Sequence, residues 1–179
     1  MKKIMFNDKY CLTQAVLNGT KTMTRRLLKD GTPLGNWEET EKSLPYKIGE
    51  IVAIAQSYHT LNKSGYVAPE WCEHTCESSA GYENKMFVRA DLMPHHIRIT
   101  DVKVERLQDI SDEDCLREGV WQFYDNKKLF YVSKAIGYAP DVAFPKAREA
   151  FRYLIDKISG NGTWESNPWM VAYSFERMD

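Results

Sequence analysis

The stretch 95–107 limits the possible folds more than any other, because its apolar residues change phase halfway along. Ile97 and Ile99 alternate as in a β-strand, but Val102 and Val104 are shifted by one position. A β-bulge between the two pairs is needed to keep all four side chains on one face. Long bulged strands are curved, and curved strands build small barrels.

The rest of the chain supplies further strands and a few short helices. Strands are predicted at Ile4–Phe6, Lys21–Leu28, Ile51–Ala55, Met86–Arg89 and Trp169–Phe175. Helices are predicted from Asn7 or Asp8 to Gly19, from Ser111 to Gly119, and from Pro145 to Gly160. The pattern indicates an α+β fold: a small, mostly antiparallel β-barrel with about three short helices packed around it.

Composition favours one folded unit. With 179 residues and 43% hydrophobic content, the chain can bury one sizeable core, so we expect a single domain over 1–179. Long loops are predicted near 29–46, 57–85 and 121–144, where glycine, proline and charged residues interrupt any periodicity.

Charge and hydropathy exclude several classes of protein. The 24 basic and 25 acidic residues leave a net charge of -1, which argues against a broad basic surface for nucleic acid. An anionic partner must therefore meet a local patch. No apolar run reaches the roughly 18 residues of a membrane span, and the first residues do not resemble a signal peptide. We expect a cytoplasmic protein with no membrane contact, and nothing in the sequence predicts a protein partner.

The cysteines predict neither disulfides nor a complete metal site. Cys72, His74 and Cys76 lie close enough together to hold part of a zinc site. A second pair of ligands at a recognisable spacing is missing, and an exposed loop is the favoured interpretation. We therefore predict no metal and no cofactor.

The segment 17–26 brings several reactive groups together. Gly19 stands where a helix ends in a left-handed turn, and a β-prone run of threonines and cations follows. A desolvated Lys21 can take a proton from the hydroxyl of Thr24, which alone is a poor nucleophile. Arg25 and Arg26 can meet an anion. The alternative is a solvated basic edge with threonines that serve only as strand formers.

Two further stretches carry candidate residues. Glu118 is expected in the last turn of a short helix, where the negative end of the helix dipole favours its protonated form. The alternative is that this acidic helix is merely solvated. Near the last strand, Trp164, Asn167 and Trp169 resemble a platform for stacking a planar base, or else the tryptophans cap the core.

Taken together, these stretches resemble the ASCH domain family, a branch of the PUA-like superfamily. The resemblance is carried by the segments 19–26, 48–52, 105–111 with its 117–119 ending, and 164–169. Its most specific part is the glycine-lysine-threonine-arginine motif in the first segment. The arrangement is most similar to the larger ASCH proteins of bacterial and phage genomes.

The resemblance implies a PUA-like barrel with a cleft beside the first helix that binds RNA, a nucleotide or a modified nucleoside. Small ASCH enzymes that deacetylate acetylcytidine use a lysine, a threonine and a glutamate, which match Lys21, Thr24 and Glu118. The expected function is amide hydrolysis at acetylated cytidine. The alternatives are an RNA-binding module without catalysis and an ASCH-type ribonuclease.

Overall fold

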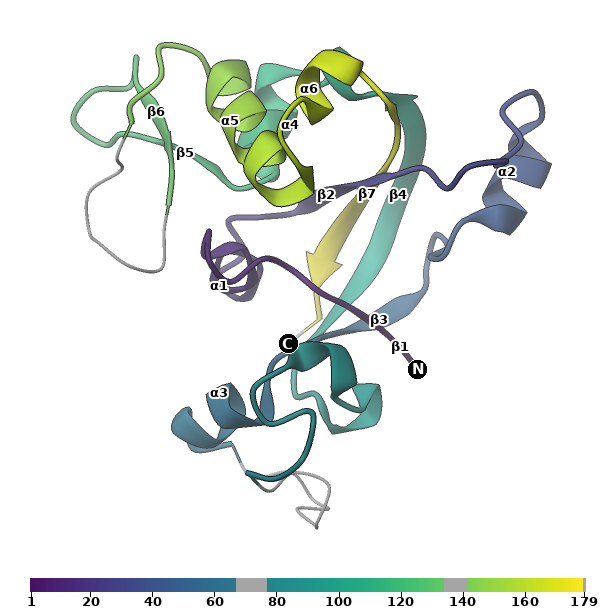
Figure 1. Ribbon diagram of the computed structural model, residues 1–179, viewed down its shortest axis with the longest axis vertical. Helices are drawn as coiled ribbons and strands as arrows, with labels where there is room; N and C mark the ends of the chain where they lie inside the picture. The colour runs from purple at the N-terminus through teal and green to yellow at the C-terminus, as the bar shows by residue number, and fades with distance from the viewer. Residues whose placement is uncertain (67–76, 134–141, 179) are drawn as a thin grey trace.

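The computed structural model describes residues 1–66, 77–133 and 142–178, and these form an α+β fold (Figure 1). The strands are β1 (Lys2–Ile4), β2 (Met23–Leu27), β3 (Ile51–Ile54), β4 (His96–Arg106), β5 (Val120–Gln122), β6 (Phe130–Val132) and β7 (Trp169–Arg177). The α-helices are α1 (Leu12–Leu17), α2 (Trp37–Ser43), α3 (Tyr58–Lys63), α4 (Asp112–Arg117), α5 (Ala147–Ser159) and α6 (Thr163–Ser166). Short 3₁₀ turns are η2 (Lys85–Phe87), η3 (Ala90–Leu92) and η4 (Leu107–Asp109). No helix among the described residues is long and apolar enough to cross a membrane.

The strands form an open sheet of five in the order β1-β3-β4-β7-β2, with β5 and β6 paired separately. The pair β1 and β3 is parallel, and the other pairs in the five-stranded sheet are antiparallel. The predicted antiparallel character is confirmed, but the described strands do not close into a barrel. The edge strands β1 and β2 have no ladder between them. Instead, the Arg26 guanidinium from β2 donates to the carbonyl of Met5, just beyond β1.

The predicted bulge in β4 is confirmed. The register between β4 and β7 shifts between Ile99 and Asp101, so that Ile97, Ile99 and Val102 are all buried. An extra residue at this point corrects the change of phase that the sequence contains. Figure 1 shows the curved β4 running beside β7 along most of its length.

Two of the predicted helices are confirmed together with the glycines that follow them, although α5 begins at Ala147, after the Pro145 predicted for its first turn. Ser111 caps α4 by accepting a hydrogen bond from the Asp114 amide, and Gly119 follows at a φ of 104°. The helix α5 ends at Gly160, also at positive φ. The first helix is shorter than predicted, since α1 begins only at Leu12.

Other predictions are wrong in detail. The first strand ends at Ile4, two residues before the predicted end. Residues 86–89 do not form a strand, because Asn84 caps the 3₁₀ turn η2 and leaves the side chains of Met86 and Phe87 exposed. The predicted loops hold regular elements as well: α2 in the first, α3 in the second and the β5-β6 pair in the third.

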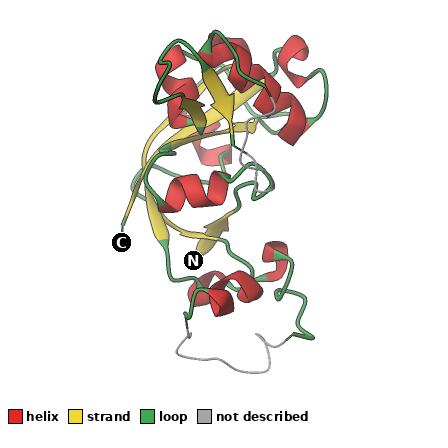
Figure 2. Cartoon of the chain, turned by 90° about the vertical axis from the view of Figure 1, so that its left-hand side faces the viewer, coloured by secondary structure: helices red, strands yellow, loops and turns green. Residues whose placement is uncertain are grey.

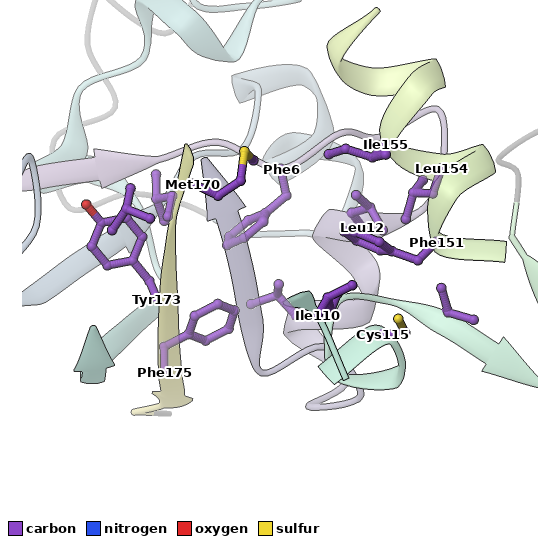
Figure 3. Packing of buried hydrophobic residues seen from close by; sticks show 14 of the residues in the cluster. Phe6, Leu12, Ile110, Cys115, Phe151, Leu154, Ile155, Met170, Tyr173 and Phe175 are labelled. Atoms are coloured by element: carbon purple, nitrogen blue, oxygen red, sulfur yellow. The ribbon is translucent and has the colours of Figure 1, made fainter. Parts of the chain in front are cut away.

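The main core joins side chains from both ends of the chain. It extends from Ile4 on β1 to Phe175 on β7. Phe151, Leu154 and Ile155 on α5 pack toward Leu12 on α1 (Figure 3). Helices α4, α5 and α6 lie at one end of the sheet and α3 at the other (Figures 1 and 2). Because α1, α4 and α5 all meet near β2, this end of the sheet holds the candidate site.

Candidate functional site

The corner between α1 and β2 turns the Lys21 side chain into the protein. Gly19 has a φ of 74°, and the amides of Thr20 and Lys21 both donate to the carbonyl of Ala15. The Thr22 amide then donates to the carbonyl of Arg117, the last residue of α4. The sequence between helix and strand is thus tied to α4 before β2 begins, and the Lys21 side chain is 2% exposed.

The Lys21 ammonium has three acceptors. Its Nζ donates to the carbonyl of Met23 at 2.7 Å, to the carbonyl of Glu118 at 2.6 Å and to Glu118 Oε2 at 2.8 Å. Burial lowers the pKa of Lys21 below its usual 10.5, and the nearby Glu118 carboxylate opposes that shift. The positive charges of Arg26 and Arg25 lower the pKa further. A lowered pKa is the change a lysine needs to act as a base.

Glu118 lies directly after α4 and is buried against two cations. Its Oε2 accepts from Lys21, and its Oε1 accepts from Arg25 Nη1 at 3.0 Å. The two oxygens therefore have different partners. The sequence alternative of a solvated acidic helix does not hold for this residue, which is 4% exposed.

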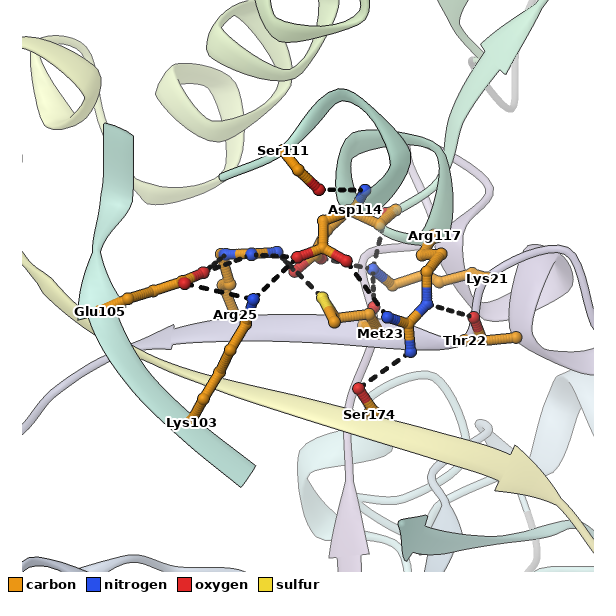
Figure 4. A network of polar contacts seen from close by, with 11 residues as sticks. Lys21, Thr22, Met23, Arg25, Lys103, Glu105, Ser111, Asp114, Arg117 and Ser174 are labelled. Atoms are coloured by element: carbon orange, nitrogen blue, oxygen red, sulfur yellow. Dashed lines mark hydrogen bonds and ion pairs between the residues drawn. The ribbon is translucent and has the colours of Figure 1, made fainter. Parts of the chain in front are cut away.

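Arg25 lies at the centre of a network of carboxylates (Figure 4). Its Nη2 donates to Glu105 Oε1 at 2.5 Å and to Asp114 Oδ2 at 3.0 Å, while Nε also donates to Glu105 Oε1. Its side chain is 0% exposed. Burial opposes the charge, but Glu118, Glu105 and Asp114 outweigh it and raise the pKa of Arg25. Arg25 thus contacts carboxylates and not solvent.

A second set of cations surrounds the same carboxylates. Lys103 Nζ lies 2.9 Å from Asp114 Oδ2 and 3.2 Å from Glu105 Oε2. Arg117 donates to Asp114 Oδ1, and also to the hydroxyl of Ser174 on β7. Burial works against ionisation of Asp114, but the hydrogen bonds from Lys103 and Arg25 prevail and lower its pKa.

A pocket of about 240 Å³ opens beside these groups. Its polar side consists of Lys21, Thr24, Arg25, Arg26 and Glu118, with Asn7 and Ser159 in addition. Its apolar side consists of Met5, Phe6, Leu12, Phe151, Leu154, Ile155 and Ile158. The structure therefore brings the three predicted catalytic residues into the lining of one pocket.

Thr24 and Arg26 have side chains with capacity left for a ligand. Thr24 is buried on β2, opposite Tyr173 on β7, and its hydroxyl has no hydrogen-bond partner among the described residues. Arg26 is half-buried and donates from Nη2 to the Met5 carbonyl. A hydroxyl without a partner in the lining of a pocket is available to a substrate.

The apolar wall was not predicted as part of the site. In the sequence, helical spacing of apolar residues predicts that this helix faces the core, through Ala147, Phe151, Leu154, Ile155 and Ile158. The spacing does not show that one end of this stripe reaches a pocket. Ile158 is 36% exposed, unlike Phe151 and Ile155, which are almost fully buried. An apolar residue at the last turn of an otherwise buried stripe was the available signal.

Four residues predicted to bind substrate do not line this pocket. Gly19 forms the corner described above. Trp164 is buried edge-on against Phe151, and Asn167 accepts a hydrogen bond from the Gln108 amide at 2.8 Å. Trp169 lies on the surface with the Arg106 guanidinium 4.4 Å from its ring. For Trp164, the structure favours the alternative of a core cap.

No group of three or more His, Cys, Asp or Glu residues in the described part of the chain is arranged to hold a metal ion. Cys72, His74 and Cys76, the residues considered for a zinc site, lie outside the described residues. Cys115 is a buried residue of α4, and burial raises the pKa of its thiol to about 12.

Comparisons with known proteins give two solved structures. One is the crystal structure of protein EF3133 from Enterococcus faecalis V583, which is described by the family model DUF984. It is 16% identical to this chain with a TM-score of 0.39, and the match covers 94% of this chain and 67% of that one. The other is an ASCH domain from Lactobacillus crispatus JV V101: 12% identity, TM-score 0.39, covering 96% and 75%. The second carries the family name that the motifs predicted. No family model matches the sequence, and neither does any curated protein.

Proposed function

We propose that the protein is a hydrolase that binds a modified nucleoside and cleaves an amide on the exocyclic amine of its base. The observation that supports this proposal most strongly is that Lys21, Thr24 and Glu118 line the same pocket. The resemblance to ASCH deacetylases, inferred from sequence motifs, supplies the substrate class, with acetylated cytidine as the first candidate.

The size and lining of the pocket favour a small ligand. At about 240 Å³ it is smaller than typical ligand pockets of roughly 300–1,000 Å³. One wall is aliphatic and aromatic and the other is charged, which suits a planar base with polar edges. A single nucleoside fits this description better than an extended RNA strand.

The proposed proton path links Thr24, Lys21 and Glu118, which line the same pocket, and its second step uses the existing contact between Lys21 and Glu118. The unprotonated Lys21 amine accepts the proton of Thr24 Oγ1 as that oxygen forms a bond to the amide carbonyl carbon. Lys21 passes a proton across the 2.8 Å contact to Glu118 Oε2, which delivers it to the leaving amine as the C–N bond breaks. Lys21 then takes a proton from a water molecule as the water oxygen bonds to the acyl carbon. The ester C–O bond breaks, Thr24 Oγ1 receives that proton from Lys21, and acetic acid leaves and releases its remaining proton to solvent.

Arg26 is the cation that can contact the ligand. In contrast to Arg25, it is half-buried and lines the pocket with donors left over after its contact with Met5. We infer that Arg26 binds the polar groups of the nucleoside, or a phosphate where one is present. We therefore assign anion binding to Arg26 alone, whereas the sequence suggested both Arg25 and Arg26.

The experiment is incubation of the purified protein with N4-acetylcytidine, with chromatography to separate cytidine and acetate. Thr24→Val keeps the shape of the side chain and removes the hydroxyl, so turnover should fall by about 100-fold or more. Thr24→Ser keeps a hydroxyl and is the matched control, which should retain most of the activity.

Absence of cytidine with the wild-type protein, or undiminished turnover in Thr24→Val, would dismiss the hydrolase. A fluorescence titration with short RNA then tests the alternatives. Salt-sensitive binding weakened by Arg26→Gln would indicate an RNA-binding module. Shortening of the RNA would indicate a ribonuclease.

A further inference from the structure

Arg25 connects the carboxylate of Asp114 on α4 with that of Glu118, the residue that caps the C-terminal end of this helix. Asp114 and Glu118 are four residues apart, which places their side chains one above the other on a helical turn. Arg25 Nη2 lies 3.0 Å from Asp114 Oδ2, and Nη1 lies 3.0 Å from Glu118 Oε1. The two ends of one guanidinium therefore bridge these two carboxylates.

The other edge of the guanidinium is held by β4. Nε and Nη2 both donate to Glu105 Oε1, at 3.2 and 2.5 Å. Nη1 also contacts Met23 Sδ at 3.1 Å. Each nitrogen of the fully buried side chain thus has a protein partner. A substrate could contact Arg25 only by displacing one of these groups, at the cost of leaving a buried carboxylate without its cation.

This arrangement divides the two oxygens of Glu118 between two cations. Oε1 is held by Arg25, and Oε2 is left facing Lys21. Without Arg25, the carboxylate could rotate about its terminal torsion, which has no strong rotamer preference. The planar fork of arginine matches two carboxylates in a way that a lysine ammonium cannot.

We propose that Arg25 is a positioning residue and not a substrate contact: it holds the Glu118 carboxylate so that Oε2 faces Lys21. This inference rests on the proposed function, in which the proton crosses from Lys21 to Glu118. Asp114 on α4 and Glu105 on β4, which both contact Arg25, also pair with Lys103, so this network of ion pairs connects α4 to β4.

Arg25 also acts on the charge of Lys21. The charged groups that act on Lys21 are Glu118, Arg26 and Arg25, and the Cys115 thiol on α4 lies near Glu118. One contact further out, around Arg25, are Glu105 and Lys103 from β4 and Asp114 and Arg117 from α4. Arg25 is a permanent cation, so it disfavours a second positive charge on Lys21 and stabilises the negative charge on Glu118. The first effect favours the free amine required for the first step, whereas the Glu118 carboxylate acts in the opposite direction on Lys21.

The first test needs no substrate. The ε-carbon of Lys21 can be followed by NMR in protein labelled with ¹³C-lysine, with the signal assigned through Lys21→Met. In Arg25→Gln the midpoint of the Lys21 titration should rise, because a cation is lost and Glu118 has Lys21 as its remaining cationic partner. A midpoint that does not change would overturn the proposal.

The second test uses acetylcytidine turnover. Arg25→Gln should lower kcat by about 10- to 100-fold and leave KM within about threefold, since it alters orientation and not binding. Arg26→Gln, the neighbouring arginine assigned to the ligand, should instead raise KM. A raised KM with unchanged kcat in Arg25→Gln would make Arg25 a substrate contact and overturn the proposal.

Arg25→Lys keeps the charge but cannot span both carboxylates, and it replaces Arg25→Gln if that variant does not fold. Its kcat should fall with KM near the wild-type value, and an effect on KM alone again overturns the proposal. If the wild-type protein shows no turnover, the proposed function fails, and the Lys21 titration decides the role of Arg25 by itself.

Discussion

Lys21 Nζ and Glu118 Oε2 lie 2.8 Å apart although the two residues are separated by 97 positions in the sequence. Both side chains are almost completely removed from solvent. A buried ion pair seldom increases stability over apolar residues of similar volume, because two charges must be desolvated. We infer that this pair is kept for its chemistry, at some expense in stability.

The two members of this pair should differ in their contribution to stability. Glu118→Gln leaves the buried cations Lys21 and Arg25 without their shared anion, and should lower the free energy of unfolding by about 3–5 kcal/mol. Lys21→Met leaves Glu118 with Arg25 and should cost about 1–3 kcal/mol. Denaturant unfolding followed by circular dichroism measures both values.

The matched control is Glu176→Gln, which removes an exposed partner of Arg98 and should leave the free energy of unfolding nearly unchanged. If Lys21→Met proved the more damaging of the two buried substitutions, the assignment of Arg25 as the second cation of Glu118 would be contradicted.

The lowered pKa of Lys21 should make stability depend on pH. Between the pKa of Lys21 in the folded protein and its usual 10.5, the unfolded chain binds more protons at this site. The contribution of Lys21 to the free energy of unfolding must therefore increase as pH rises through that window. The difference in stability between wild type and Lys21→Met, measured at several pH values, isolates this contribution, and a difference that is flat with pH would refute it.

Catalysis should follow the same titration. Since the first step needs the free amine, kcat/KM on acetylcytidine should rise with pH up to the pKa of Lys21 and then level off. The midpoint should agree with the NMR titration of Lys21. A rate that falls over the range in which Lys21 loses its proton would mean that the ammonium, and not the amine, is the active form.

Two glycines at positive φ should differ in their tolerance of alanine. At Gly19 an added Cβ meets nothing within 4 Å. Gly19→Ala should therefore lower the free energy of unfolding only by the strain of alanine in a left-handed conformation, about 1–2 kcal/mol. At Gly119 the Cβ would lie 2.8 Å from Leu12 Cδ2, which adds about 1–3 kcal/mol of overpacking. Thermal unfolding of the two variants gives the order, and equal costs would show that Leu12 moves aside freely.

The tryptophans near β7 should affect stability and not nucleoside binding. Trp164→Ala removes a buried ring and should cost about 3–5 kcal/mol, whereas Trp169→Ala removes a surface ring and its contact with Arg106 and should cost less than about 1 kcal/mol. Neither should change the KM for acetylcytidine. An increased KM in Trp169→Ala would restore this residue as a stacking surface for the base.

Local signals in the sequence were sufficient for several elements. The change of phase along β4 predicts its bulge, and Ser111 with Gly119 marks both ends of α4. The apolar stripe of α5 and the glycine after it were equally informative. These features depend on interactions within a few residues, or on which side of a strand is apolar. Both are visible in the sequence without knowledge of the tertiary structure.

The predictions failed for two reasons: at 86–89 a strand and a 3₁₀ turn were both compatible with the local sequence, and the barrel depended on long-range pairing. Met86 and Phe87 look like strand residues, but the amide oxygen of Asn84 caps a 3₁₀ turn and leaves both exposed. The predicted barrel required pairing between β1 and β2, and the described structure has a side-chain contact from Arg26 there instead. Closure of a sheet depends on the lengths and positions of strands that are distant in sequence.

The sequence by itself determined the local conformations around this site: the glycine corner after α1, the β2 strand that carries Thr24, and the capped helix that ends at Glu118. Only the tertiary structure decided that Lys21 and Glu118 meet, that Arg25 turns toward carboxylates, and that α5 forms the apolar wall of the pocket. The physical reason is the range of the forces. Caps, glycine turns and strand alternation act between near neighbours, whereas contacts across tens of residues depend on how the complete core packs.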